Sequence, residues 1–496
     1  MTEAGDTTTP SGYEPPAGAE LTGTWESGER RIEYTARAEW LVLRKQEKPA
    51  AEVFTVSYVA DGADASRPVT FVFNGGPGAA SAYLHLGAVG PTRVAFPADG
   101  SLPPMPPRLE PNESSWLAFT DLVFVDPVGT GFSRIVDGAK PADGKEKSED
   151  TVDPKEYFGP KRDLEALCEA LGRWLSAHRR WGSPVVIAGE SYGGYRAARL
   201  TRTLQETAGI GLSGAVLISP ALEFATLTPD DYGVAGWVDM LPTMALAAVH
   251  HARSRAFPAG TPAAEVRAAA EAFAIGDYAS FLAGGGTTEP DVRTRILARL
   301  ADLTGLDQGL VERSGGRVPF ATFARELLRD ERKVVGFYDA TITAGDPFPD
   351  REPFAGPDPT LAGQVAVYTT AINRLLRSDL GVESDREYAL LSYDVFNAWR
   401  DDSDPHAFQP PPGATDDLRY GLALNPHLRV FLTHGRYDLV TPYFASDRLV
   451  GLMRLDDATA ARLTVEHFDG GHMFYAWEAS RRAFTAAIER FYGSFA

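Results

Sequence analysis

The sequence contains a single cysteine, Cys168, among its 496 residues, which excludes an intrachain disulfide. Cys168 lies in DLEALCEALGRWL, where apolar residues recur at helical spacing, so we expect a buried helix residue rather than a nucleophile. Disulfide-free proteins are typical of reducing compartments. We therefore expect a cytoplasmic location.

Positive charge is also scarce. The chain has 48 Lys and Arg against 67 Asp and Glu, which gives a net charge of −19. Binding to a nucleic-acid backbone depends on clustered Lys and Arg that displace counterions. We therefore expect no nucleic-acid partner.

Long apolar runs are missing as well. No stretch approaches the roughly 18 consecutive apolar residues of a membrane span, so we expect no membrane partner. The first thirty residues have neither a basic start nor an apolar segment, and they do not resemble a signal peptide. We expect a flexible arm over residues 1–28. The sequence also lacks Cys/His metal spacing and a phosphate-binding glycine loop, so we expect no metal and no cofactor.

What the sequence does contain is enough apolar material for a large core, at 44% hydrophobic and 10% aromatic residues. Runs typical of β-strands occur at 31–44, 51–60, 68–74, 121–126, 184–189, 214–219, 428–434 and 462–468. From the third run onward most are short and apolar throughout, as parallel strands covered on both faces are. Helical patterns separate several of them, which predicts an α/β fold.

About two hundred residues of different character separate the strands at 214–219 and 428–434. Helical patterns in this stretch lie at 261–274, 291–305 and 320–333. We predict a helical cap over 222–390, inserted into a core formed by 29–221 and 391–496. Solvated loops are predicted at 137–154 and 401–417.

The stretch VVIAGESYGGY places Gly189, Ser191 and Gly193 in a G-x-S-x-G motif between an apolar strand and a helix that stops at Gly209. At such a junction a tight turn lifts the serine hydroxyl clear of the sheet and needs small neighbours. The alternative is an ordinary serine that caps the helix. The strand before it and the helix after it favour a nucleophile.

A serine nucleophile needs a base, and the base needs an orienting acid. Asp438 follows the strand at 428–434, and His472 lies in a glycine-flanked turn before the final helix. Each residue has a simpler alternative, because Asp438 could bond its own turn and His472 could be a surface histidine. The chain order Ser, Asp, His and the placement at strand ends predict a catalytic triad.

Hydrolysis by such a triad also needs N–H donors for the oxyanion. One donor is the amide of Tyr192, the residue after the nucleophile. The other is expected from a glycine-rich turn after an early strand, and VTFVFNGGPG supplies Asn74 to Gly78 at that place. Glycines there let the backbone approach the substrate closely, although such a turn is also a common connection.

These motifs, with DLVFVDPVGTGFS between them, resemble the serine carboxypeptidase family, α/β-hydrolases that remove the C-terminal residue of peptides. They occur in the family's order over roughly residues 50 to 490. The resemblance implies an α/β-hydrolase fold with a mostly parallel sheet and an inserted helical cap. It also implies the following site residues: Ser191, Asp438 and His472 as the triad, and the amides of Gly76 and Tyr192 as the oxyanion hole.

The resemblance further implies that the Asn74 side chain, the Gly75 amide and the Glu190 carboxyl hold the substrate's terminal carboxylate. A carboxyl group can donate a hydrogen bond to a carboxylate only while it is protonated, so this recognition should weaken as the pH rises. The sequence departs from the family at Ala88, where a second acid often stands. It also has Tyr475 where proline is common, which we expect to reshape the pocket rim.

Ala79 replaces a cysteine that the family usually has after NGGPG, as expected for a disulfide-free, bacterial-like branch. We predict a serine-type carboxypeptidase whose partner is a peptide with a free C-terminus. An esterase or acyltransferase is the first alternative, because an alcohol can intercept the same acyl-enzyme. The remaining alternative is a non-catalytic interaction protein that uses the cap as a docking surface.

Overall fold

The structure is a computed structural model that describes residues 13–136, 154–400 and 413–495. The two predicted solvated loops, at 137–154 and 401–417, lie largely outside these residues.

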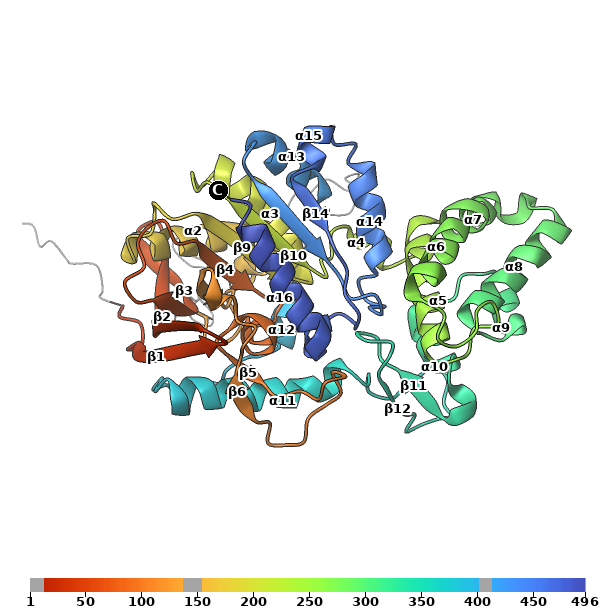
Figure 1. Ribbon diagram of the computed structural model, residues 1–496, viewed down its shortest axis with the longest axis horizontal. Coiled ribbons are helices and arrows are strands. Elements are labelled where there is room, and N and C mark those ends of the chain that lie inside the picture. The colour runs from red at the N-terminus through yellow and green to blue at the C-terminus, as the bar shows by residue number, and fades with distance from the viewer. Residues whose placement is uncertain (1–12, 137–153, 401–412, 496) are drawn as a thin grey trace, which may run out of the picture.

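Ten of the described strands form one large mixed sheet (Figure 1). Nine of them follow the order β1-β2-β3-β7-β4-β9-β10-β13-β14, and β8 (Arg134–Ile135) pairs with β3 beside this path. The nine are β1 (Ala19–Ser27), β2 (Arg30–Lys45), β3 (Lys48–Ala60), β7 (Asp121–Val125), β4 (Val69–Phe73), β9 (Val185–Glu190), β10 (Gly214–Ile218), β13 (Arg429–Thr433) and β14 (Leu463–Val465). Neighbours from β7 to β14 pair in parallel, whereas the pairs among β1, β2, β3 and β7 are antiparallel. The α/β fold with a mostly parallel core is confirmed.

Alternate side chains of the central strands face two separate layers of helices. On β4, Val72 belongs to one hydrophobic cluster, and Phe71 and Phe73 belong to the other. Successive side chains of a strand point to opposite faces, so a strand covered on both sides is apolar throughout. One layer contains α2 (Pro160–Ala177), α3 (Tyr192–Glu206) and α13 (Thr415–Leu424), and the other contains α11 (Leu361–Asn373) and α16 (Glu478–Tyr492).

Cys168 lies on α2 and is 8% exposed, which confirms the predicted buried helix residue. Burial raises the pKa of its thiol to about 12. At neutral pH the group is therefore a protonated thiol with little nucleophilic character.

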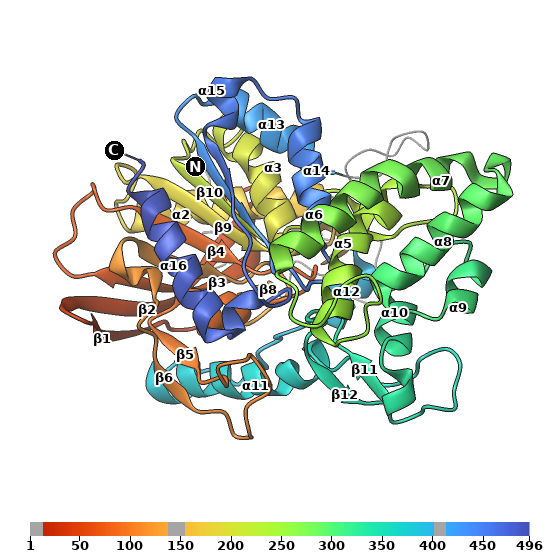
Figure 2. The ribbon, with the colours of Figure 1, turned by 45° about the vertical axis from the view of Figure 1, so that its right-hand side comes forward.

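Helices α5 to α10, between β10 and β13, share a third hydrophobic cluster, which also includes Leu439, Tyr443 and Phe444 from the segment after β13. They lie together beside the sheet, in green in Figures 1 and 2. The longer ones are α5 (Ala235–His250), α6 (Ala263–Phe273) and α8 (Pro290–Thr304), followed by the shorter α10 (Phe320–Glu326). The helix expected over 320–333 is wrong beyond Glu326, because Arg332 adopts a left-handed backbone conformation and Lys333 begins β11 (Lys333–Val335).

The N-terminal segment differs from the predicted arm. Residues 19–27 form β1, which pairs along its whole length with β2. Trp25 is 3% exposed, and its indole N–H donates a hydrogen bond to the Asn112 carbonyl at 2.7 Å. A flexible arm over all of 1–28 is therefore wrong for β1, whereas residues 1–12 lie outside the described residues.

The end of the insertion packs with the main core rather than with the other inserted helices. Val367 and Tyr368 of α11 belong to the cluster that also contains Phe484 of α16. The domain limits expected at 222 and 390 remain a prediction.

In the described part of the chain, no helix has both the length and the apolar character needed to cross a membrane.

Candidate active site

Ser191 lies on a strained turn between β9 and α3. Its backbone has φ 61° and ψ −122°, a conformation that a residue with a side chain rarely adopts. The turn leaves no room beside it: a Cβ on Gly189 would lie 1.9 Å from the Gly193 carbonyl oxygen, and one on Gly193 would lie 2.5 Å from the Phe73 carbonyl oxygen. The small residues of G-x-S-x-G are therefore a steric requirement of this turn.

His472 and Asp438 form a buried pair. The His472 Nδ1–H donates a hydrogen bond to Asp438 Oδ2 at 2.6 Å. The carboxylate is fully buried and also accepts the backbone N–H groups of Val440, at 2.8 Å, and Thr441, at 3.0 Å. The Thr441 hydroxyl donates to it at 2.6 Å. These bonds fix the carboxylate and leave Nε2 as the free nitrogen of the imidazole.

The electrostatics of His472 follow from this pairing. Burial disfavours the charged imidazolium, but the Asp438 carboxylate outweighs burial, so the pKa of His472 is raised. The His472 backbone N–H donates to the Tyr338 carbonyl at 2.5 Å, and the Tyr338 ring lies edge-on to the imidazole, with centroids 5.2 Å apart. Tyr338 comes from the inserted segment and was not among the predicted site residues.

Ser191 and His472 line the same cavity, which has a volume of about 80 Å³. None of the described hydrogen bonds joins the Ser191 hydroxyl to His472, and such bonds often tighten only when substrate binds. The other lining residues are Asn74, Gly75, Gly76, Ala79, Tyr83, Glu190, Tyr338, Leu361, Leu391 and Met473. The predicted nucleophile, base and carboxylate-binding residues thus lie together, with Asp438 bound to the base.

The glycine-rich turn after β4 lies against the start of α3. A Cβ on Gly75 would lie 2.4 Å from the Tyr192 nitrogen, and Gly76 has φ +96°. Tyr192 is the first residue of α3, so its N–H has no acceptor within the helix. The positive end of the helix dipole also favours an anion here. Stabilisation of the oxyanion by the Gly76 and Tyr192 amides remains a prediction.

A buried ion pair fixes this turn. The Arg196 guanidinium is 1% exposed and binds Asp163, with Nε 2.7 Å from Oδ2. The same guanidinium donates to the Asn74 carbonyl at 3.0 Å. Because a buried charge is costly unless it is paired, this contact holds the backbone of the turn in one position.

Glu190, the last residue of β9, is 2% exposed. It accepts a hydrogen bond from the Asn74 side-chain amide, and the Tyr475 hydroxyl lies 2.9 Å from each of its two oxygens. Burial dominates these contacts and raises the pKa of Glu190 to about 7. The carboxyl group therefore changes its charge near neutral pH. Whether it binds a substrate carboxylate remains a prediction.

Tyr475 is fully buried, so the expectation that it reshapes the pocket rim is wrong. Its ring instead fills the space beside the segment that carries Ala88. A Cβ on Gly87 would lie 2.6 Å from the Tyr475 ring and 2.7 Å from the Tyr368 hydroxyl. Ala88 itself is 1% exposed. The contact between Tyr475 and Glu190 was not predicted from the sequence. The only sign of it there is that Tyr475 lies three residues after His472.

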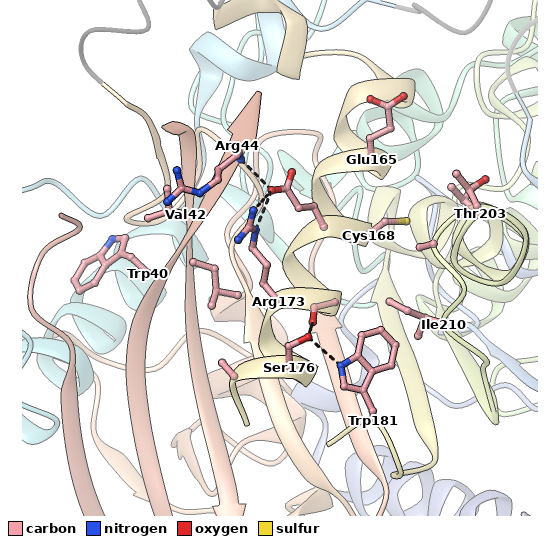
Figure 3. Close-up of a pocket in the computed structure, with 16 residues that line it drawn as sticks. Trp40, Val42, Arg44, Glu165, Cys168, Arg173, Ser176, Trp181, Thr203 and Ile210 are labelled. Atoms are coloured by element: carbon pink, nitrogen blue, oxygen red, sulfur yellow. Dashed lines mark hydrogen bonds and ion pairs between the residues drawn. The ribbon is translucent and has the colours of Figure 1, made fainter. Parts of the chain in front are cut away.

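A larger cavity, of about 950 Å³, lies between β2 and the helices α2 and α3 (Figure 3). None of the predicted site residues lines it, and Cys168 is its only thiol. The Glu169 carboxylate in this cavity already has partners, because it accepts hydrogen bonds from the Arg44 backbone N–H and from the Arg173 side chain, both at 2.9 Å.

In the described residues, no group of three His, Cys, Asp or Glu side chains could hold a metal ion.

Comparisons with known proteins relate this chain to serine carboxypeptidases. The family model for serine carboxypeptidase matches residues 36–233, a stretch that includes Ser191 but neither Asp438 nor His472. A pheromone-processing carboxypeptidase of Sclerotinia sclerotiorum is 31% identical over 136 residues, which are 27% of this chain and 18% of that protein. The retinoid-inducible serine carboxypeptidase of Rattus norvegicus is 29% identical over 181 residues, 36% of this chain and 34% of that protein. The aligned segments therefore span about a third or less of these relatives.

A crystal structure of a prohormone-processing carboxypeptidase from Saccharomyces cerevisiae matches over 93% of this chain and 92% of that chain. Its TM-score is 0.53 at 16% sequence identity. At this identity the match shows a shared fold.

Proposed function

Since the chain belongs to the serine carboxypeptidase family and has the α/β-hydrolase fold, we propose that it is a serine-type carboxypeptidase that removes C-terminal residues from peptides. The main support for the proposal is that three features line one cavity. They are a serine on a strained strand-to-helix turn, a histidine paired with a buried aspartate, and a buried glutamate. We further propose a cytoplasmic setting, supported by the single buried cysteine.

In the proposed reaction, Ser191 Oγ attacks the carbonyl carbon of the last peptide bond while His472 Nε2 takes the hydroxyl proton. Asp438 holds the imidazole in the required tautomer and stabilises the imidazolium. The amides of Gly76 and Tyr192 would bind the oxyanion, which is worth about 2.7–4 kcal/mol per donor. His472 then protonates the leaving amino group, and a water molecule, activated by the same histidine, hydrolyses the acyl-enzyme.

Recognition of the terminal carboxylate is assigned to Asn74, Gly75 and Glu190. A protonated Glu190 can donate a hydrogen bond to the substrate carboxylate, whereas an ionised Glu190 would repel it. With its pKa raised to about 7, Glu190 is protonated in mild acid and loses that proton as the pH rises through neutrality. A single buried acid therefore suffices for pH-dependent recognition, even though Ala88 supplies no second one.

The two titrating groups act in opposite directions on kcat/KM. His472 must be neutral to accept the serine proton, so activity should fall as the pH drops below its raised pKa. Glu190 must be protonated, so binding of a free acid should fall as the pH rises above about 7. A free-acid substrate should give a bell-shaped profile, whereas an amidated substrate should show only the acid limb.

An esterase or acyltransferase remains a second candidate. The observation that favours it is the absence of a second acid at Ala88, where the Tyr475 and Tyr368 side chains fill the neighbouring space. Such an enzyme would use the same triad but would have no need to recognise a free C-terminus.

The test compares N-blocked dipeptides that are identical except for a free, amidated or esterified C-terminus. We expect release of the C-terminal amino acid from the free-acid peptide. The plot of kcat/KM against pH should be bell-shaped for the free acid and should show only the acid limb for the amide. Identical pH profiles for acid and amide, or hydrolysis of the ester alone, would reject the carboxypeptidase and favour the second candidate.

A further inference from the structure

A second cavity, of about 720 Å³, lies away from the triad and is rich in arginine. It is formed by β1, β2, β5 (Thr92–Val94), β6 (Leu109–Pro111) and the first turns of α16, which lie next to one another in Figures 1 and 2. Its walls carry five arginines: Arg31, Arg93, Arg108, Arg481 and Arg482. Three glutamates line the cavity with them, and Glu33 and Glu478 lie within ion-pair distance of Arg31 and Arg482.

Four of these arginines have carboxylate partners. The pairs are Arg31 with Glu26 at 2.9 Å, Arg93 with Glu110, Arg108 with Glu110 at 2.8 Å, and Arg482 with Glu478 at 2.8 Å. The fifth, Arg481, has no carboxylate within ion-pair distance in the described part of the chain. Arg481 is therefore the arginine of this cavity that has no ion pair among the described residues.

Arg481 is also the most buried of the five, at 4% exposed. The one described hydrogen bond of its guanidinium goes to the Tyr475 carbonyl at 3.3 Å, and its Nε–H is buried with no acceptor in the described residues. Burial, followed by repulsion from Arg93, lowers the pKa of Arg481 to about 10. A buried cation without a counter-ion is costly, so an anion that supplies one would be bound favourably.

We propose that this cavity is a binding site for a small anionic molecule, whose phosphate or carboxylate group is held by Arg481 and Arg93. A guanidinium presents two parallel N–H donors that match the oxygens of either group. The volume lies within the roughly 300–1,000 Å³ typical of small-molecule sites, so the ligand can be larger than a single phosphate. The cavity in Figure 3 offers a contrast, because the Arg173 guanidinium there is paired with Glu169 and the Arg44 guanidinium donates to the Glu47 carbonyl.

The test is calorimetric titration of the full chain with inorganic phosphate and, separately, with citrate, at constant ionic strength. We expect saturable binding of at least one of them, and the tighter ligand identifies the anionic group that the site prefers. Arg481→Gln should weaken this binding roughly tenfold or more, as expected for a hydrogen bond to a charged group. Arg482→Gln is the matched control, because it removes the same charge from an exposed arginine of the same cavity and should change the affinity little.

A second variant keeps the test valid if Arg481→Gln fails to fold. Glu110→Gln removes the carboxylate that competes for Arg93, so the affinity should rise. Glu113→Gln, which removes an exposed carboxylate of the same cavity, should change it less. The proposal is overturned if neither anion binds saturably, if Arg481→Gln and Arg482→Gln bind alike, or if Glu110→Gln binds no more tightly than Glu113→Gln.

This binding site does not depend on the proposed function. Ser191→Ala should bind phosphate or citrate as tightly as the unmodified chain does, because Ser191 does not line the cavity. A loss of binding in that variant would contradict the assignment to the Arg481 cavity.

Discussion

The two sides of the candidate active site are built in different ways. On one side, Asn74, Ser191 and Asp438 follow the carboxyl ends of β4, β9 and β13, which the parallel register brings to one edge of the sheet. On the other side, Tyr338 and Leu361 come from the segment inserted between β10 and β13. The sheet fixes the first side, whereas the second depends on how the insertion packs.

Under the proposed function, this difference predicts that the strand ends carry the triad and bind the terminal carboxylate, whereas the insertion selects among substrate side chains. Substitution of a triad residue on the sheet side should therefore abolish turnover with all substrates. Substitutions on the inserted side should change which substrates are preferred.

Ser191→Ala should give the largest effect, a loss of roughly a millionfold in kcat, because the triad acts as a unit. The melting temperature should stay the same or rise, since the strained turn loses only a hydroxyl. Steady-state kinetics and thermal melts of the purified variant check both expectations. Retention of most of the activity would reject Ser191 as the nucleophile.

Asp438→Asn should lower kcat on the order of ten-thousandfold, because an amide permits the wrong imidazole tautomer. The matched control is Asp447→Asn, which makes the same change in a second Asp–His pair, where His467 Nε2 lies 2.8 Å from Asp447 Oδ1. Asp447 does not line the candidate site, so its variant should keep kcat within a few-fold. Equal losses in the two variants would contradict the assignment of Asp438.

Glu190→Gln should remove the alkaline limb of kcat/KM for free-acid peptides, because an amide donates a hydrogen bond at any pH. Above neutral pH the variant should bind the free acid about tenfold more tightly than the unmodified enzyme does, since a donor to a charged group replaces a repelling carboxylate. Hydrolysis of the matched amidated peptide serves as the control and should keep its profile. An alkaline limb that survives in the variant would show that another group causes it.

Leu361→Ala tests the inserted side. Loss of a pocket-lining side chain should change the preference between large and small substrate side chains by roughly tenfold, while turnover of the preferred substrate persists. Leu452→Ala is the control, because Leu452 is 60% exposed and lies outside the cavity. An equal loss of turnover with all substrates would instead show that Leu361 supports the catalytic residues rather than substrate selection.

Tyr475→Phe should give the smallest effect. Its hydroxyl favours the ionised form of Glu190, so its removal should raise the pKa of Glu190 further and move the alkaline limb to higher pH. The change should stay within about fivefold at any one pH, the usual scale of a single neutral hydrogen bond. A shift of the limb to lower pH would show that the hydroxyl supports the protonated form.

The chemical side could be predicted from the sequence because its signals are local. The apolar strands, the small residues around Ser191 and the turns that carry Asp438 and His472 are each visible within about ten residues. The order of these residues along the chain then predicts that they lie close together, since parallel strands end at one edge of the sheet.

The remaining features depend on contacts between distant segments. β1 is largely polar, and only its pairing with β2 and the burial of Trp25 make it part of the sheet. Nothing near Tyr338 in the sequence indicates that it lies against His472, more than a hundred residues away. Arg481 is likewise one arginine among many until the structure shows that its neighbours have carboxylate partners, whereas it has none among the residues that the structure describes.

The central claim is that Ser191 is activated by His472 and Asp438, and labelling with an active-site-directed fluorophosphonate tests it most directly. The full chain should be labelled at one serine, and mass spectrometry of its peptides should place the label on Ser191. Ser191→Ala should remove the label, and His472→Ala should slow its attachment by orders of magnitude while the fold is retained. A chain that takes up no label, or takes it up elsewhere, would contradict the account.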